Sequence, residues 1–467
     1  MTTATTQPAA SQATLDSINP STGEVVGSVP VATPDEVRAA VKRARAAQPA
    51  WEAMSLEQRI TTLLPAGKIL MDRAEELGEL LCREMGKPLA EATGEVQACA
   101  SNWEEELREI AEALSPQILE DEHTRSTVYR DPLGVCAAIT PWNFPILMPH
   151  WLLLPALMAG NTVVFKPSEE TPLIGQAYAD ALASCLPEDV LITVHGADEQ
   201  GKALVAAEVD LIVFTGSLEV GKKIMAEAAG GLKRILLELG GKDPLLVLDG
   251  ADLDAAATFA ARNAFRNAGQ VCVSTERIYV SDTLHDDFVE KLRAESAKLV
   301  VADGMQEGTS IGPMINSGQR DHVLRQIDQA AKDGATVVVA DGSDSPSGGG
   351  NFVKPTILTG VSHAMEVAME ESFGPVVTVT KVSSDDEAVA LANDTPYGLG
   401  AAVFGDPERA KQAARRIKAG MVGVNKGLGG ASGTPWVGMK QSGIGFHSGP
   451  EGHRQFAQVR VVSEAKD

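Results

Sequence analysis

The chain has 467 residues, of which 44% are hydrophobic and 22% charged, and its formal net charge is −23. This length predicts two or three domains with a large core, and the composition is typical of a globular protein. The acidic charge disfavours binding to nucleic acid or to a membrane surface, and no apolar run is long enough for a membrane span.

The cysteines and the N-terminal segment indicate the compartment. The five cysteines are odd in number, form no CxxC pair and have the spacing of neither a disulfide scaffold nor a zinc site. We therefore expect free thiols and no metal site. The first sixteen residues are small and polar and lack the features of a signal peptide, so we expect a loose terminus and a cytoplasmic protein.

Helical periodicity comes first along the chain, from Pro34 to about Leu114, with apolar residues every three or four positions. The stretch 124–136 then alternates and is rich in β-branched residues, which predicts a hairpin followed by a strand. The alternating C-terminal stretch 454–467 is expected to join this hairpin in a small protruding sheet.

Two series of short apolar runs then alternate with helical segments, one before about Gly240 and one after Gly250. This alternation predicts parallel sheets covered on both faces. We therefore predict an α/β fold with two doubly wound, Rossmann-like domains. The Gly- and Ser-rich stretch 342–352 is predicted to be a flexible surface loop.

Cys272 is the first candidate for chemistry. It lies between two valines just before a predicted strand, where a cysteine is usually a small buried hydrophobe. A reactive cysteine needs a neighbouring base and donors for the oxyanion that forms on attack at a carbonyl. No histidine is near it in the sequence, so a Cys/His protease is not indicated. The available acid is Glu238, which is equally typical of an ion-pair or helix-cap residue when considered alone.

Three further stretches carry polar groups at the ends of predicted strands. Asn143 lies in the stiff segment "PWNFP", which suits an oxyanion donor but is also typical of an ordinary proline-rich turn. Gly216 and Ser217 join a strand to a helix, where backbone N–H groups suit a phosphate, although most such turns bind nothing. Lys166 and Glu169 follow another strand, where ligands of doubly wound sheets collect.

Taken in order, these motifs resemble the aldehyde dehydrogenase superfamily, in its NAD(P)-dependent, non-acylating branch. The resemblance covers nearly the whole chain and adds "EESFGPV", "NDTPYGLGAAVF" and "KQSGIG" to PWNFP, KPSE, FTGS, LELGGK and GQxC. It implies that Cys272 attacks the aldehyde and that the Asn143 side chain and the Cys272 backbone N–H stabilise the oxyanion. It also implies that Glu238 activates the water that hydrolyses the thioester, so that a free acid is released.

The same resemblance implies the cofactor, which is NAD, with NADP possible. Glu169 would bind the adenosine ribose with Lys166 and repel a 2′-phosphate, Ser217 would bind the pyrophosphate, and Glu371 with Phe373 the nicotinamide ribose. The cofactor-binding residues implied are Ile139, Thr140, Trp142, Lys166, Ser168, Glu169, Gly216, Ser217, Leu239, Gly240, Glu371 and Phe373.

Domain roles and assembly follow from the resemblance as well. Residues 1–123 and 137–239 are expected to form the cofactor-binding domain and residues 240–440 the catalytic domain. Residues 124–136 and 441–467 are expected to form oligomerisation elements, so a homodimer or homotetramer is predicted. An exposed hairpin would otherwise be a sheet-edge liability.

The chain departs from the family pattern at a few positions. Phe446 and His447 replace a common arginine and acid, and Gln458 replaces a second acid, which suggests a replaced ion pair at the interface. Leu152 stands in place of a frequent lysine and Val437 in place of a glycine.

The residues that line the substrate pocket by resemblance are all apolar or aromatic: Phe144, Met148, Trp151, Val271, Val273 and Trp436. They predict an uncharged aromatic or medium aliphatic aldehyde, because a substrate carboxylate calls for an arginine. A succinic-semialdehyde-type dehydrogenase is the alternative, in which Lys426 or His150 supplies the cation. A catalytically inactive structural relative and an esterase or thiol hydrolase are the alternatives of another class.

Overall fold

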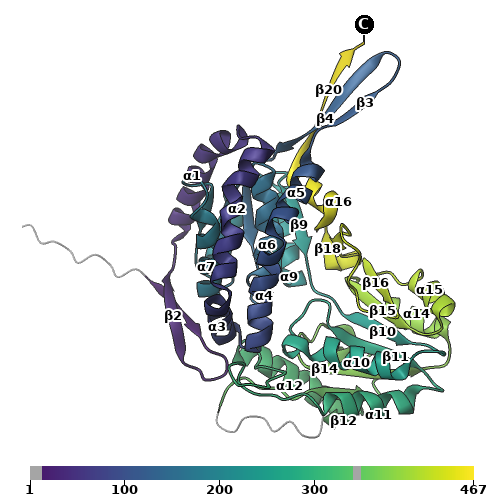
Figure 1. The fold of residues 1–467 in the computed structure, drawn as a ribbon. Coiled ribbons are helices and arrows are strands. Elements are labelled where there is room, and N and C mark those ends of the chain that lie inside the picture. The colour runs from purple at the N-terminus through teal and green to yellow at the C-terminus, as the bar shows by residue number, and fades with distance from the viewer. Residues whose placement is uncertain (1–12, 340–348, 467) are drawn as a thin grey trace, which may run out of the picture.

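The computed structural model describes residues 13–339 and 349–466, and it contains two α/β bodies with a narrow β-sheet arm (Figure 1). Each body is built on a mainly parallel sheet, so the predicted fold class is confirmed. No helix in the described part of the chain is both long and apolar enough to cross a bilayer.

The first body begins with a hairpin and a layer of helices. The hairpin strands are β1 (Thr14–Ile18) and β2 (Val25–Pro30). The helices are α1 (Pro34–Glu52), α2 (Leu56–Asp72), α3 (Ala74–Met85), α4 (Leu89–Ser101) and α5 (Trp103–Leu114). They confirm the predicted helical stretch, and capping boxes at Thr33 and Ser55 start the first two helices.

The sheet of the first body has six strands in the order β18-β9-β8-β5-β6-β7. Its strands are β5 (Val135–Ile139), β6 (Thr162–Lys166), β7 (Leu191–Thr193), β8 (Leu211–Thr215), β9 (Arg234–Glu238) and β18 (Gly443–Ile444). The connecting helices are α6 (Leu147–Met158), α7 (Pro172–Ala183), α8 (Asp198–Ala206) and α9 (Leu218–Ala229). Val163 and Phe165 face one hydrophobic core and Val164 the other, so both faces are buried and the strands read as continuous apolar runs.

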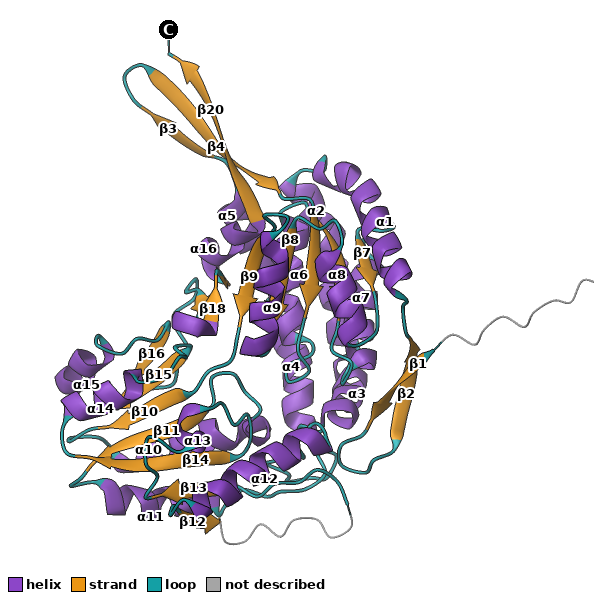
Figure 2. Ribbon diagram, turned by 180° about the vertical axis from the view of Figure 1, so that it is seen from behind, coloured by secondary structure: helices purple, strands orange, loops and turns teal. Residues whose placement is uncertain are grey.

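The sheet of the second body has seven strands in the order β12-β13-β14-β11-β10-β15-β16. Its strands are β10 (Asp243–Val247), β11 (Thr275–Ser281), β12 (Thr336–Val339), β13 (Thr356–Thr359), β14 (Val376–Val382), β15 (Gly400–Phe404) and β16 (Met421–Val424). Its helices are α10 (Leu253–Phe265), α11 (His285–Ser296), α12 (Ser317–Lys332), α13 (Glu366–Met369), α14 (Asp385–Asn393) and α15 (Pro407–Ala414). Seen from behind, the strands of the first sheet run toward this body (Figure 2).

The arm is a three-stranded antiparallel sheet in the order β20-β4-β3. Its strands are β3 (Gln117–Glu120), β4 (Thr124–Pro132) and β20 (Ala457–Ala465). It projects away from both bodies in Figures 1 and 2. The predicted pairing of the C-terminal strand with the hairpin is therefore confirmed.

The ranges of the arm differ from those expected. Residues 135–136 belong to β5 of the first sheet, and the hairpin instead begins at Gln117. In the C-terminal segment only β20 joins the arm, because β18 pairs with β9 and the short helix α16 (Gly449–His453) contacts α5.

The expected loose terminus is wrong for Thr14–Asp16, which lie in β1. Residues 1–12 and residues 342–348 of the predicted surface loop lie outside the described part of the chain.

Candidate active site

The predicted site residues gather where the strands of the first sheet end. Ile139, Lys166, Thr215 and Glu238 are the last residues of β5, β6, β8 and β9. The parallel register pairs Ile139 with Lys166 and Thr215 with Glu238, so these ends form one continuous edge. Ligands of doubly wound sheets bind at this edge.

A cavity of about 730 Å³ lies along the edge. Eight of the predicted cofactor-binding residues line it: Ile139, Thr140, Trp142, Lys166, Ser168, Glu169, Gly216 and Ser217. Lys166 is buried, and its Nζ lies 3.2 Å from Oε2 of Glu169, which is partly exposed. Ser217 caps α9, whose backbone N–H groups therefore open toward the cavity. A carboxylate, an ammonium group and a helix start in one cavity fit the ribose and phosphates of a dinucleotide.

A second cavity, of about 280 Å³, shares the walls at Trp142 and Gly216 with the first. It is lined by the other four predicted cofactor residues and by two of the catalytic ones: Leu239, Gly240, Glu371, Phe373, Asn143 and Cys272. The structure thus brings Cys272, from the second body, to the strand edge of the first.

A tight turn presents Cys272. The residues before it, Asn267, Ala268 and Gly269, all have positive φ, and a Cβ on Gly269 would lie 2.1 Å from the carbonyl oxygen of Gly374. After it, the Asn263 amide donates to the Val273 carbonyl at 2.9 Å, while the Ser274 hydroxyl donates to the Asn263 carbonyl at 3.2 Å. The loop is therefore anchored on both sides of the thiol.

Asn143 reaches the same place from the other body. Its Nδ2 donates to the Gln270 carbonyl at 3.0 Å, two residues before Cys272. An amide nitrogen carries two hydrogens, and the described contacts use one of them. The buried Lys87 fixes the backbone, because its Nζ donates to the Asn143 carbonyl at 2.8 Å and pairs with Glu95 at 2.5 Å.

Glu238 points at the thiol. Its Oε1 lies 3.9 Å from Cys272 Sγ and accepts a hydrogen bond from Trp436 Nε1 at 2.8 Å. Its Oε2 lies 2.7 Å from His447 Nε2. Burial raises the pKa of the Cys272 thiol well above its ordinary value, and the charge of Glu238 raises it further. The resting thiol is therefore protonated and has a carboxylate within reach of its proton.

Two glycines after Glu238 are required by close neighbours. A Cβ on Gly240 would lie 2.1 Å from Glu371 Oε2, and one on Gly241 would lie 2.5 Å from the Cys272 carbonyl oxygen. Glu371 accepts from the Gly241 N–H at 3.0 Å, and burial raises its pKa to about 8. The "LELGGK" spacing thus lets the Glu371 carboxyl and the Cys272 loop lie against one backbone segment.

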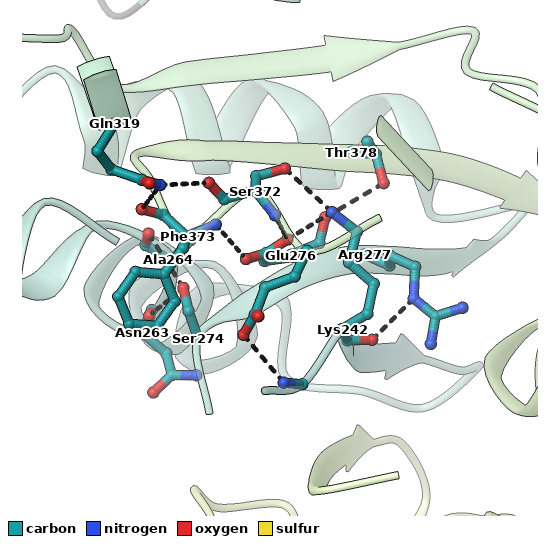
Figure 3. A network of polar contacts seen from close by, with 12 residues as sticks. Lys242, Asn263, Ala264, Ser274, Glu276, Arg277, Gln319, Ser372, Phe373 and Thr378 are labelled. Carbon is teal, nitrogen blue, oxygen red and sulfur yellow. Dashed lines mark hydrogen bonds and ion pairs between the residues drawn. The ribbon is translucent and has the colours of Figure 1, made fainter. Parts of the chain in front are cut away.

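A buried ion pair positions the loop that carries Glu371 and Phe373 (Figure 3). Lys242 pairs with Glu276, whose carboxylate accepts from the backbone N–H groups of Ser372 at 2.8 Å and Phe373 at 2.9 Å. The Gln319 amide donates to the carbonyls of Ser372 and Phe373 at 3.1 Å. These contacts hold Phe373 at a φ of 50°, with its ring edge-on to Trp142 at 5.4 Å.

The predicted substrate residues are only partly brought together. Met148 lines the cavity that contains Cys272, and Trp151 and Trp436 pack 5.6 Å apart beside Glu238. Val271 and Val273 flank the thiol in the chain and are partly exposed. Phe144 is buried, with the Lys87 ammonium 4.1 Å above its ring.

The two cations expected for the alternative substrate do not lie in this pocket. His150 is buried against Glu106 and Tyr178, and Lys426 is exposed and donates to the Gly429 carbonyl. Arg266, which the sequence reasoning missed, instead lies 5.5 Å from the Phe144 ring and 3.7 Å from Glu91. Arg266 lies six residues before Cys272 in the sequence, and this short separation was the signal that could have identified it as a residue near the pocket.

His447 was also missed as a site residue. The sequence indicated a changed interface at residues 446–447, whereas the structure places His447 on the Glu238 carboxylate. Gln458, the third position of that expectation, accepts from Arg234 at 3.1 Å. Within the described residues, no group of three or more His, Cys, Asp or Glu side chains is placed to hold a metal ion.

Comparison with known proteins identifies the family. The model of the aldehyde dehydrogenase family matches residues 7–462. The chain belongs to the aldehyde dehydrogenase family. It is therefore an oxidoreductase that uses NAD or NADP.

Relatives and solved structures extend over nearly the whole chain. Glutarate-semialdehyde dehydrogenase of Pseudomonas putida is 39% identical and covers 96% of this chain and 94% of its own. Succinate-semialdehyde dehydrogenase [NADP(+)] GabD of Escherichia coli is 38% identical, with 96% and 94% covered. A mutant of P. syringae AldA indole-3-acetaldehyde dehydrogenase, solved with NAD+ and IAA, is 34% identical with a TM-score of 0.93, and 97% of this chain and 93% of that one are covered.

Proposed function

We propose that this aldehyde dehydrogenase oxidises an aldehyde to the free carboxylic acid, with Cys272 as nucleophile, Asn143 as oxyanion donor and Glu238 as general base. One observation supports the proposal most strongly: Cys272 Sγ lies 3.9 Å from Glu238 Oε1, while Asn143 lines the same cavity as the thiol. A nucleophile, a base and an oxyanion donor around one space are the requirements for acyl transfer.

In the first step Cys272 Sγ adds to the aldehyde carbon, and its proton moves to Glu238. The Asn143 amide and the Cys272 backbone N–H stabilise the oxygen that becomes negative. NAD(P)+, whose nicotinamide ribose Glu371 and Phe373 would hold, would supply the hydride acceptor, and loss of hydride from this carbon would leave a thioester on Cys272. Glu238, after losing its proton, takes one from a water molecule that attacks the thioester, and the C–S bond breaks to release the acid.

The residues of the large cavity support NAD as the preferred cofactor. The Glu169 carboxylate can accept hydrogen bonds from the hydroxyl groups of a ribose, and its negative charge repels a 2′-phosphate. Lys166, at 3.2 Å from Glu169, also offers a cation to a phosphate, so NADP is the second cofactor. We assign cofactor binding to the first body and the nucleophile to the second.

For the substrate we propose an uncharged aromatic or medium aliphatic aldehyde. Met148 lines the cavity that contains Cys272, and Trp436 contacts Glu238 and packs against Trp151, so these side chains offer apolar surface near the thiol and the base. A semialdehyde with a terminal carboxylate is the second candidate. It is favoured by Arg266 beside Phe144 and by relatives named for glutarate and succinate semialdehydes.

A panel of aldehydes tests both substrate candidates. Each aldehyde is assayed with NAD and then with NADP, and the absorbance of the reduced cofactor is followed. Higher kcat/KM for benzaldehyde and hexanal than for succinic semialdehyde is expected. If kcat/KM is instead higher for succinic semialdehyde, Arg266→Gln tests the reason. A variant that loses activity with succinic semialdehyde but keeps its kcat/KM for hexanal would establish the second candidate. No reduced cofactor with any aldehyde would contradict the activity itself.

We further propose that the arm joins two or more copies of the chain. Its β20 exposes Val459, Val461 and Val462, and β3 exposes Ile118 and Leu119. An uncovered apolar edge of this kind is a liability in a monomer. Val461→Asp is expected to shift the mass measured by light scattering toward the monomer, and an unchanged mass would contradict this.

A further inference from the structure

The two oxygens of Glu238 are held by two residues that face each other across one small sheet. This sheet pairs β17 (Trp436–Val437) with β19 (Phe446–His447), and Trp436 lies directly opposite His447. Trp436 Nε1 donates to Oε1 at 2.8 Å, and His447 Nε2 lies 2.7 Å from Oε2. The terminal torsion of a glutamate is soft, so these contacts decide which oxygen faces the thiol.

His447 is itself fixed in place. Its side chain is 4% exposed, and its ring lies 5.1 Å from Trp151 and nearly parallel to Trp436, at 12°. Its Nδ1 lies 2.8 Å from the Ser448 hydroxyl, which either donates a hydrogen bond or accepts one. Neutral imidazole with hydrogen on Nε2 and imidazolium are therefore both satisfied at this site.

We propose that His447 is a positioning residue for the hydrolytic step: it anchors Oε2 of Glu238, so that Oε1 faces Cys272, and it shares the proton that Glu238 takes from the attacking water. This inference rests on the proposed function and deepens it. In the step, the Glu238–His447 pair goes from one negative charge to none, the water oxygen bonds to the acyl carbon, and the C–S bond breaks. The sulfur then takes this proton from the pair, which restores the protonated thiol, and the released carboxylic acid loses its own proton to solvent.

The surroundings suit a shared proton. A cavity of about 10 Å³ beside the pair has apolar or glycine walls apart from the pair itself and Trp436, and it has room for about one water molecule. The other titratable groups that face the pair are Cys272, at Oε1, and His453 of α16. Burial lowers the pKa of His453 to about 4, and His447 contributes to this, so His453 stays neutral near pH 7.

The test compares His447→Ala and His447→Gln with the wild type. The first removes the His447 contact with Oε2 and leaves only the longer contact from the Thr215 hydroxyl at 3.5 Å, and the second keeps an N–H donor that does not titrate. His453→Ala is the matched control, because it removes another buried imidazole of the same segment, whose partner Glu109 lies outside the site. Thermal unfolding of each variant establishes that it is folded.

In His447→Ala we expect the NADH burst to be kept while steady turnover and p-nitrophenyl acetate hydrolysis fall about 10- to 100-fold, the cost of a misplaced catalytic group. His447→Gln should recover most of the rate at pH 8. Because the glutamine amide cannot share a proton, the acid limb of its pH–rate profile should differ from that of the wild type. His453→Ala should behave as the wild type.

An unchanged deacylation rate in His447→Ala, or an equal loss in His453→Ala, would overturn the proposal. So would a His447→Gln variant with the wild-type pH profile. If His447→Ala does not fold, the pH profile of His447→Gln decides. The ester assay needs no cofactor, so it tests the role of His447 even if no aldehyde is oxidised. Failure of the proposed function is then seen in the aldehyde assay alone.

Discussion

Glu238 Oε1 lies 3.9 Å from Cys272 Sγ, although the two residues belong to different sheets. Glu238 ends β9 of the first body, and Cys272 precedes β11 of the second. Burial, and after it the negative carboxylate, raises the pKa of the thiol, and in the proposed mechanism the same carboxylate accepts its proton. The distance between the proposed base and the proposed nucleophile therefore depends on how the two bodies pack.

Cys272→Ala should abolish NADH formation, because no other described group beside Asn143 and Glu238 can form the thioester. Cys185→Ala, which changes a partly buried free thiol on another part of the chain, should leave the rate unchanged. Stopped-flow absorbance measures both. Turnover by Cys272→Ala would show that the proposed mechanism is wrong.

Glu238→Gln should slow steady turnover by about 10²–10⁴, the usual contribution of a general base, and leave an NADH burst that is slower than in the wild type because the amide no longer takes the Cys272 proton. The amide keeps the size of the side chain but accepts no proton from water. Rapid mixing with excess aldehyde separates burst from steady state. A variant that loses the burst and the steady rate together would place Glu238 in the first step alone.

Glu169→Gln should raise kcat/KM with NADP relative to NAD by about tenfold, which corresponds to the loss of about 1.4 kcal/mol of repulsion. Glu170→Gln is the control, since Glu170 is the adjacent acid and accepts from Asn316 instead. Initial rates with each cofactor give the ratio. If the ratio of kcat/KM with NADP to kcat/KM with NAD is the same in the wild type and in Glu169→Gln, Glu169 does not determine which cofactor is preferred.

Asp243→Asn should make stability less dependent on pH. Burial raises the pKa of Asp243 to about 8, although its Oδ1 accepts from the Gly400 N–H at 3.0 Å. The stability that the protonated Asp243 contributes to the folded state is therefore fully present below about pH 4, and it is lost as the pH rises through about 8. As the pH rises from 5 to 8, the thermal midpoint of the variant should rise relative to that of the wild type.

Asp72→Asn, at an exposed position, serves as the control for this measurement. Its midpoint should follow the wild-type curve over the same range. Parallel curves for Asp243→Asn and the wild type would mean that Asp243 is ionised throughout.

Local sequence was sufficient for much of the fold. Strands such as Thr162–Lys166 are buried on both faces, so their apolar runs are visible without any partner. Cys272, Glu238 and Asn143 were predicted from motifs. β3 and β13 were missed, because each is a four-residue strand with no clear pattern of its own.

The supporting contacts of the site were decided by tertiary structure alone. Lys87 binds the Asn143 carbonyl, and Glu276 holds the Phe373 loop, through pairs far apart in the chain. His447 meets Glu238 across 209 positions, where the motif had indicated only a changed interface. A sequence shows which residues can ionise or donate, whereas the packing of one sheet edge against another loop determines which of them meet. The chain alone therefore predicted most of the strands and the candidate reacting residues, and the fold determined how those residues lie relative to one another.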